Sequence, residues 1–185
     1  MKRLFVLAVL LIAASFPALA QNPRNDYKNI NLIETLEAAG DFKTLLAALR
    51  QTGLIDTLKS PGPFTLFAPN DAAFAKLPPG ALNELMKNPA ELRSLLLYHV
   101  TEGKFFIKDL QNKTDKTITT MENRKAWFQC DEIGASPQSK AKLLCNDISP
   151  TPIIINRSAR VVMGDLSASN GMIHVIDNML RPAAN

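Results

Sequence analysis

The sequence predicts an α+β fold, in which helices from the first half pack on a β-sheet or β-wedge formed mainly by the second half. Apolar residues at helical spacing are concentrated before residue 100, for example Leu45, Leu46 and Leu49. Segments of strand character follow mainly after residue 115 and end with residues 172–176. Helices and strands that are segregated along the chain are typical of α+β proteins and not of alternating α/β proteins.

The first twenty residues have the pattern of a cleaved secretion signal. Lys2 and Arg3 precede an apolar run over residues 4–14, and residues 18–20 form a small-x-small cleavage site. The run is shorter than the roughly 20 residues that span a membrane, and no second run of that length follows. We therefore expect a signal peptide over residues 1–20, a polar tail over 21–28 and a secreted or periplasmic single domain over 29–185, without a transmembrane segment in the mature chain.

The charge pattern argues against nucleic acid as a partner. Lys2 and Arg3 supply two of the four net positive charges, so the predicted mature chain is nearly balanced. The remaining basic residues are scattered, without a run of four or more. A nucleic-acid-binding surface would require a basic cluster.

The two cysteines, Cys130 and Cys145, are predicted to form a disulfide in an oxidising compartment. Closing a loop of about 15 residues would stabilise the fold by about 3 kcal/mol. The alternative is a zinc site with His99 and His174. Zinc ligands usually come in closely spaced pairs, and no two of these four residues are close in sequence, which favours the disulfide.

Residues that cap helices precede several apolar stretches in the first half. They are Asn31 with Glu34 in a capping box, Asp41, Asn70 or Asp71, and Asn88 followed by Pro89. The helix that begins at Pro89 is expected to continue through Tyr98, His99 and Val100. Residues 64–68 alternate like a strand before Pro69 ends the pattern.

The second half contains strand candidates over residues 117–121, 125–130, 142–145, 153–155, 159–163 and 172–176. Asn170-Gly171 before the last of them predicts a tight hairpin whose two central residues have positive φ. Because the final strand is so apolar, we expect it to be inserted as a central strand among elements formed earlier. Alternation along this strand places the side chain of His174 on the face opposite to that of Ile173 and Val175.

Three blocks in this order carry a family resemblance. They are residues 65–74 (TLFAPNDAAF, with Asn70 and Asp71), Tyr98-His99 after three leucines, and residues 169–177 (SNGMIHVID, with Asn170, Gly171 and His174). Together they span most of residues 29–182 and resemble the fasciclin domain family, a secreted or cell-surface module. The resemblance implies a single fasciclin-like domain, and the short basic signal is typical of bacteria.

Two segments depart from the family pattern. Residues 131–152 form a longer connection than is usual in the family. We interpret this segment as a hairpin insertion that the Cys130–Cys145 disulfide closes. Residues 156–159 read Asn-Arg-Ser-Ala where Asn-Gly-Ala is common in the family.

The resemblance also implies partner-binding residues. In animal relatives an Asp-Ile pair before the final motif and the Tyr-His block are associated with integrin binding. Asp165-Leu166, here preceded by Met163-Gly164, and Tyr98-His99 stand at the matching positions. The alternative is structural, with Asp165 capping a turn and the Leu166 side chain in the core.

The predicted function is a non-enzymatic adhesion or interaction module that binds a protein or polysaccharide at the cell envelope or extracellular matrix, with no cofactor, metal or catalytic residue. A second possibility is a carrier of an apolar small molecule or lipid, in a pocket lined by Phe105-Phe106 and Trp127-Phe128. A hydrolase is the third, and it would need His99 or His174 beside a hydroxyl and a carboxylate in a cleft. No Gly-x-Ser-x-Gly elbow is present.

Overall fold

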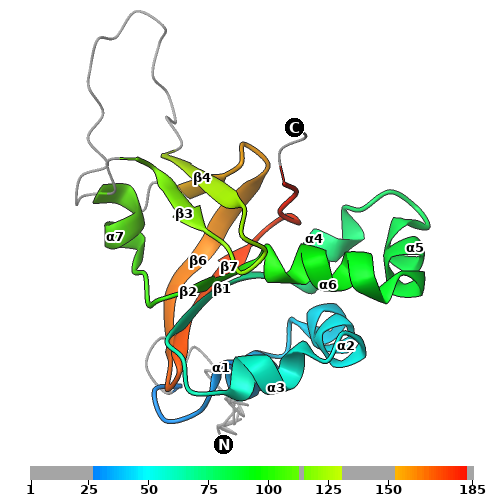
Figure 1. The fold of residues 1–185 in the computed structure, drawn as a ribbon, viewed down its shortest axis with the longest axis horizontal. Coiled ribbons are helices and arrows are strands. Elements are labelled where there is room, and N and C mark those ends of the chain that lie inside the picture. The colour runs from blue at the N-terminus through cyan, green and yellow to red at the C-terminus, as the bar shows by residue number, and fades with distance from the viewer. Residues whose placement is uncertain (1–26, 113–114, 131–152, 183–185) are drawn as a thin grey trace, which may run out of the picture.

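The computed structural model describes residues 27–112, 115–130 and 153–182 (Figure 1). The predicted signal peptide, the strand at 142–145 and the insertion at about 131–152 lie outside the described residues. The elements in chain order are α1 (Leu32–Ala39), α2 (Lys43–Gln51), α3 (Leu54–Lys59), β1 (Phe64–Pro69), α4 (Asp71–Ala75), α5 (Ala81–Lys87), α6 (Pro89–Leu97), β2 (Val100–Glu102), α7 (Ile107–Asn112), β3 (Thr117–Thr119), β4 (Lys125–Cys130), β5 (Ile153–Ile155), β6 (Ala159–Ala168) and β7 (Gly171–Ile176). Within these ranges no helix has the length and apolarity needed to cross a bilayer.

The last strand lies inside the sheet, as its sequence predicts. The order of the seven strands is β2-β1-β7-β6-β5-β4-β3, so β7 is flanked by β1 and β6. Its pairing with β1 is parallel, its pairing with β6 is antiparallel, and all six of its residues are buried. A strand buried on both faces needs a nearly continuous apolar run, which residues 172–176 supply apart from His174.

The sheet curls until its two edges nearly meet. The hydroxyl of Thr101 on β2 donates to the carbonyl of Thr119 on β3 over 2.7 Å, and the amide of Met121 donates to the carbonyl of Val100 over 2.7 Å. The molecule is thus a near-barrel with helices against it, which confirms the predicted α+β class. In Figure 1 helices α2, α5 and α6 lie on one side of the long strands β6 and β7, and α7 lies on the other.

The core has two parts, because β1 and β7 bury side chains on both faces of the sheet. One cluster fills the space between the helices and the sheet; it includes Leu32, Leu36, Leu45, Leu49, Leu92, Leu166, Ile173 and Val175. The other fills the interior of the curled sheet; it includes Phe67, Tyr98, Ile118, Phe128, Ile155, Val161, Ile176 and Leu180. Ile173 and Val175 therefore face the helices, as the alternation predicts.

Some helix starts follow the local signals and others do not. Asn31 and Glu34 form the expected capping box of α1, and the Asn70 side chain caps α4. The start of α2 is different from the prediction: Asp71, and not Asp41, accepts from the amides of Lys43 and Thr44 at 3.2 and 2.8 Å. A carboxylate from a distant segment can satisfy the free amides of a first turn as well as a local cap does.

Helix α6 begins as predicted and ends earlier. Pro89 occupies its first turn, but the Asn88 side chain makes no capping hydrogen bond. The helix ends at Leu97, and Val100, which was expected to extend it, begins β2. Tyr98 and His99 therefore form the corner between α6 and β2.

The β6–β7 hairpin is present, but its turn differs from the predicted one. Ala168 pairs with Gly171, so the two loop residues are Ser169 and Asn170, and neither of them has positive φ. The Asn170 side chain has another role: its oxygen accepts from the amide of Leu32, and its nitrogen donates to the carbonyls of Leu58 and Ser60, at 2.8–2.9 Å. Asn170 thus joins the hairpin to the start of α1 and the end of α3.

Gly171 is required for close packing and not for its φ angle. A Cβ atom at this position would lie 2.3 Å from the carbonyl oxygen of Phe64 and 3.1 Å from a methyl carbon of Leu32. The absent side chain lets β1 and β7 approach each other where their pairing begins.

Candidate functional site

His99 is a buried structural residue at the corner between α6 and β2. Its Nδ1 donates to the carbonyl of Leu95 at 2.7 Å, and its Nε2 accepts from the amide of Leu180 at 2.9 Å. Complete burial lowers its pKa from 6.5 to about 4, although the hydrogen bond to Leu95 acts in the opposite direction. The ring is therefore neutral at pH 7, with both nitrogens engaged by backbone groups.

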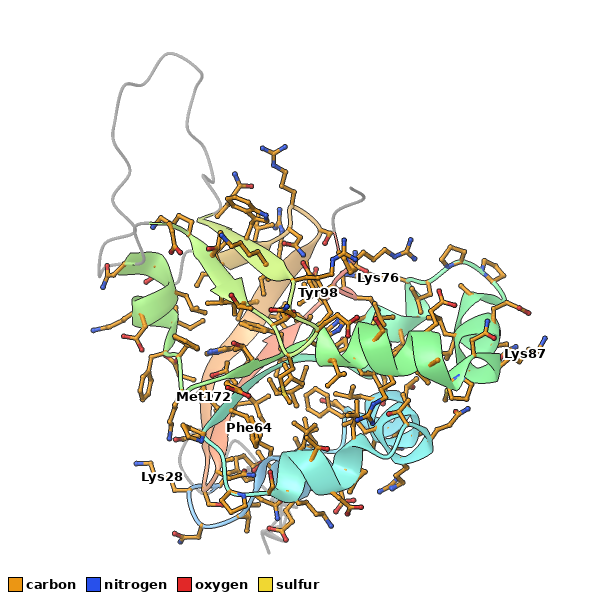
Figure 2. All side chains as sticks on the ribbon, viewed as in Figure 1. Lys28, Phe64, Lys76, Lys87, Tyr98 and Met172 are labelled. Carbon is orange, nitrogen blue, oxygen red and sulfur yellow. The ribbon has the colours of Figure 1, made fainter. Side chains whose placement is uncertain are left out.

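Tyr98 is also buried, where α6 meets the strands (Figure 2). Its hydroxyl donates to the carbonyl of Lys125 at 2.9 Å and accepts from the amide nitrogen of Asn156 at 2.8 Å. The same Asn156 nitrogen donates to the carbonyl of Arg181 at 3.2 Å. Since His99 holds Leu180, the Tyr-His pair fastens the segment after β7 to the end of α6.

Asn156 links Tyr98 to the Arg181 backbone, and local sequence patterns did not indicate this role. It has φ +51 and the following Arg157 has φ +57, so both occupy the left-handed region in the turn between β5 and β6. Asn tolerates this conformation better than most residues. The only sequence signal is the Asn-Arg pair where relatives commonly have Asn-Gly.

His174 has the same kind of surroundings as His99. Its Nδ1 accepts from the amide of Asp165 at 3.1 Å, its Nε2 donates to the carbonyl of Phe105 at 2.9 Å, and its ring centroid lies 5.5 Å from that of Phe67. Burial lowers the pKa of His174, against smaller opposing effects of the Phe105 hydrogen bond and the Asp165 charge.

The imidazoles do not have the surroundings that a hydrolase or a zinc site requires. All four ring nitrogens of His99 and His174 are hydrogen-bonded to backbone groups, and in the part of the chain that the structure describes neither ring lies between a hydroxyl and a carboxylate. A metal ligand or a general base needs a free lone pair. Cys130 is the last residue of β4 and Cys145 lies outside the described residues, so their disulfide stays a prediction.

Asp165 is the exposed member of the predicted binding residues. It lies at an irregularity of β6, where the pairing with β7 shifts between Met163 and Leu166, and it has φ +58. Its Oδ1 accepts from the amide of Ile107 at the start of α7 at 2.9 Å. Leu166 next to it is only 5% exposed and belongs to the core.

Gly164 explains how α7 approaches this bulge so closely. A Cβ atom there would lie 2.6 Å from a side-chain carbon of Ile107 and 3.4 Å from Nδ1 of His174. The glycine thus allows the Asp165 backbone to reach His174 while the Asp165 side chain reaches Ile107.

Two exposed apolar side chains come from the segments that adjoin this carboxylate, one just before Ile107 and one two residues before Asp165. Phe106 is 45% exposed and Met163 is 43% exposed. The Lys104 ammonium lies 5.9 Å from the centroid of the Phe106 ring and donates to the hydroxyl of Ser167 at 2.9 Å. We call Lys104, Phe106, Met163, Asp165 and Ser167 the Asp165 surface.

The aromatic residues proposed to line one apolar pocket do not share a cleft: Phe105 borders one, and Trp127 and Phe128 border another. Phe105 borders a cleft of about 440 Å³ between β2 and β3, together with threonines and Met121. Trp127 and Phe128 border a cleft of about 550 Å³ beside the β5–β6 turn. Phe128 mainly packs inward, with its ring centroid 5.8 Å from that of Phe67.

Comparisons with known proteins agree with this architecture. The chain is 37% identical over 150 residues to an uncharacterized protein of Synechocystis, covering 81% of this chain and 96% of that protein. It is 32% identical over 149 residues to the immunogenic protein MPB70 of Mycobacterium bovis, covering 78% of this chain and 65% of that protein. It is 31% identical over 154 residues to the transforming growth factor-beta-induced protein ig-h3 of Oryctolagus cuniculus, covering 83% of this chain and 20% of that protein.

A solved structure has the same fold. The FAS1 domain pair from the insect cell adhesion molecule fasciclin I superposes with a TM-score of 0.57, covering 84% of this chain and 51% of that chain at 18% identity. The family model of the fasciclin domain matches residues 40–182, which is well over half of the sequence. The chain therefore belongs to the fasciclin domain family.

Proposed function

We propose that the chain is a non-enzymatic adhesion or interaction module that binds a protein or polysaccharide at the cell envelope or in the extracellular matrix. The observation that carries the proposal is the exposed carboxylate of Asp165, which the Ile107 amide holds in place, with the exposed Phe106 and Met163 on the adjoining segments. The fold it shares with a cell adhesion molecule supports the same function.

Asp165 is positioned to meet a partner's cation or N–H donor. One oxygen of the Asp165 carboxylate accepts a hydrogen bond from the amide of Ile107. The backbone amide of Asp165 itself donates to Nδ1 of His174. The other oxygen makes no hydrogen bond within residues 27–112, 115–130 and 153–182. A charged group that is held in place before binding loses little entropy when a partner arrives.

The side chains around Asp165 provide the apolar contact that such an interaction needs. Phe106 and Met163 are both large and partly exposed, and aromatic residues and methionine are enriched at protein interfaces. Leu166, Tyr98 and His99 are buried, so their side chains are not available to a partner. In this proposal Asp165 binds the partner, and the other three predicted residues hold the fold.

A non-enzymatic function is consistent with the engaged histidines. Carrier function is less well supported, because the aromatic residues are divided between two clefts and Phe128 is part of the core. We further propose that residues 1–20 are removed on export. N-terminal sequencing of exported protein should begin at Gln21, and a start at Met1 would contradict export by cleavage.

The test is cosedimentation of purified residues 21–185 with cell envelopes of the source organism. Asp165→Asn is the informative variant, since Asn keeps the acceptor for the Ile107 amide and tolerates positive φ, so that only the charge is removed. We expect saturable binding that Asp165→Asn weakens about tenfold or more. Asp56→Asn, on the exposed side of α3, removes the same charge elsewhere and should bind normally. Equal binding by Asp165→Asn and the unmodified chain would contradict the proposed surface.

A further inference from the structure

The cleft beside the β5–β6 turn has the composition of a ligand site that the Asp165 surface does not include. It is lined by Lys116, Trp127, Phe128, Gln129, Asn156, Arg157 and Arg181, and its volume is about 550 Å³. A cleft of this size accommodates a small molecule or a few units of a chain polymer. Trp127 is 54% exposed although large aromatic side chains are usually covered.

Asn156 holds the walls of the cleft in fixed positions. Its backbone amide donates to the carbonyl of Trp127 and its side-chain oxygen accepts from the amide of Trp127, both at 2.9 Å. Its side-chain nitrogen donates to Tyr98 and to the carbonyl of Arg181. One hydrogen-bond network around the half-buried Asn156 therefore positions the Trp127 backbone, the adjacent Arg157 and the Arg181 backbone relative to one another.

Among the described residues, the charged side chains that line the cleft are all positive. Arg157 and Arg181 are exposed, and among the described residues no carboxylate pairs with either guanidinium. Lys116 adds a third positive charge, and its ammonium donates to the carbonyl of Gln111, which leaves that charge without a carboxylate partner among the described residues. Within residues 27–112, 115–130 and 153–182, the lining contains no acidic side chain. These three basic side chains favour a ligand that carries negative charge.

The remaining groups indicate the kind of anion. An exposed indole offers a flat apolar face to the C–H face of a sugar ring, guanidinium groups bind carboxylates or sulfates with paired hydrogen bonds, and the exposed amide of Gln129 can pair with hydroxyls. A protein partner would be expected to need several apolar anchors, and here Trp127 is the one exposed aromatic among charged and amide side chains. We propose that this cleft binds an acidic polysaccharide, with Trp127 stacking on a sugar ring and with Arg157 and Arg181 binding its carboxylate or sulfate groups.

The chain contains a single tryptophan, so its fluorescence reports on this cleft alone. The probes are hexasaccharides of galacturonate and of chondroitin sulfate, and the control is the methyl-esterified galacturonate hexamer, which has the same sugar without the charge. We expect a saturable change in Trp127 emission with at least one acidic probe, weakened by added salt, and none with the neutral ester.

Two charge-removing variants test the assignment of residues. Arg157→Asn suits the left-handed φ of this position, and Arg181→Gln leaves the carbonyl bonded to Asn156 in place. Each should weaken binding of the acidic probe about tenfold. Lys59→Gln, an equal charge change at the end of α3, should have no effect.

The inference rests on the proposed interaction function, and the two can fail separately. Asp165→Asn should bind the acidic hexasaccharide normally, because it lies outside the cleft. Failure of both acidic probes, equal binding of polyglutamate or single-stranded DNA, or full binding by Arg157→Asn and Arg181→Gln would overturn the cleft assignment. If the cleft assignment fails in this way but Asp165→Asn still loses envelope binding, the Asp165 surface remains supported.

Discussion

The amide of Leu180 donates a 2.9 Å hydrogen bond to Nε2 of His99, across a separation of 81 residues. This bond requires a neutral imidazole, because a protonated ring has no acceptor to offer. His99, in the corner between α6 and β2, therefore holds the segment after the last strand only while its ring is uncharged.

The burial of His99 predicts that stability falls as the pH is lowered from about 6.5 to about 4. The pKa is 6.5 in the unfolded chain and about 4 in the folded one, so in this window the unfolded chain takes up a proton that the folded chain does not. The free energy of unfolding should fall by about 3 kcal/mol through this group, and His174, whose pKa is also lowered, acts in the same direction.

Urea midpoints measured between pH 4 and pH 7.5 check this dependence. His99→Gln should be less stable at pH 7 but should show a flatter pH dependence, with the remaining slope supplied by His174. A variant that keeps the full slope would show that His99 titrates normally in the folded protein.

Asn170→Ala should destabilise the protein by about 3 kcal/mol, because it removes three hydrogen bonds that join the hairpin to α1 and α3. Asn170→Asp should also be destabilising despite its similar shape, since its carboxylate would face the carbonyls of Leu58 and Ser60. Chemical denaturation measures both effects. Asn83→Ala, on the exposed face of α5, is the control and should change stability by less than about 0.5 kcal/mol.

Two glycines should respond differently to alanine. Gly171→Ala places a methyl group 2.3 Å from the Phe64 oxygen and should cost about 3 kcal/mol or more. Gly40→Ala meets no atom within 4 Å, and its cost of about 1 kcal/mol comes from its positive φ. If the thermal unfolding midpoints show the reverse order, the close approach of β1 and β7 is wrong.

The Cys130–Cys145 disulfide is tested by intact-mass measurement of the exported protein. Alkylation without reductant should add no label, and alkylation after reduction should add two. Two labels on the folded, unreduced chain would rule out the bond and remove the predicted gain of about 3 kcal/mol.

Sequence patterns predict the parts of this fold that depend on neighbouring residues. The capping box of Asn31 and Glu34 is local, and the apolar composition of residues 172–176 is sufficient to place β7 inside the sheet. Alternation also predicts the face on which His174 lies.

The contacts that define the candidate site could not be predicted in this way, since their partners are far apart in sequence. Asp71 caps α2 from 28 residues away, Asn156 meets Tyr98 across 58 residues, and Asn170 reaches Leu58 across 112. In each case a polar side chain that looks like a turn or cap residue is used by a distant element. The resemblance to known relatives identified Tyr98, His99 and Asp165, and only the structure separates the exposed residue from the buried ones.

The central claim is that Asp165 binds a partner while Tyr98 and His99 hold the fold. The most direct test measures unfolding free energy and envelope affinity together for Asp165→Asn and Tyr98→Phe. Asp165→Asn should keep its stability within about 0.5 kcal/mol and lose affinity about tenfold. Tyr98→Phe should lose about 1–3 kcal/mol of stability and bind normally once folded. Full affinity in Asp165→Asn together with lost affinity in folded Tyr98→Phe would contradict the account.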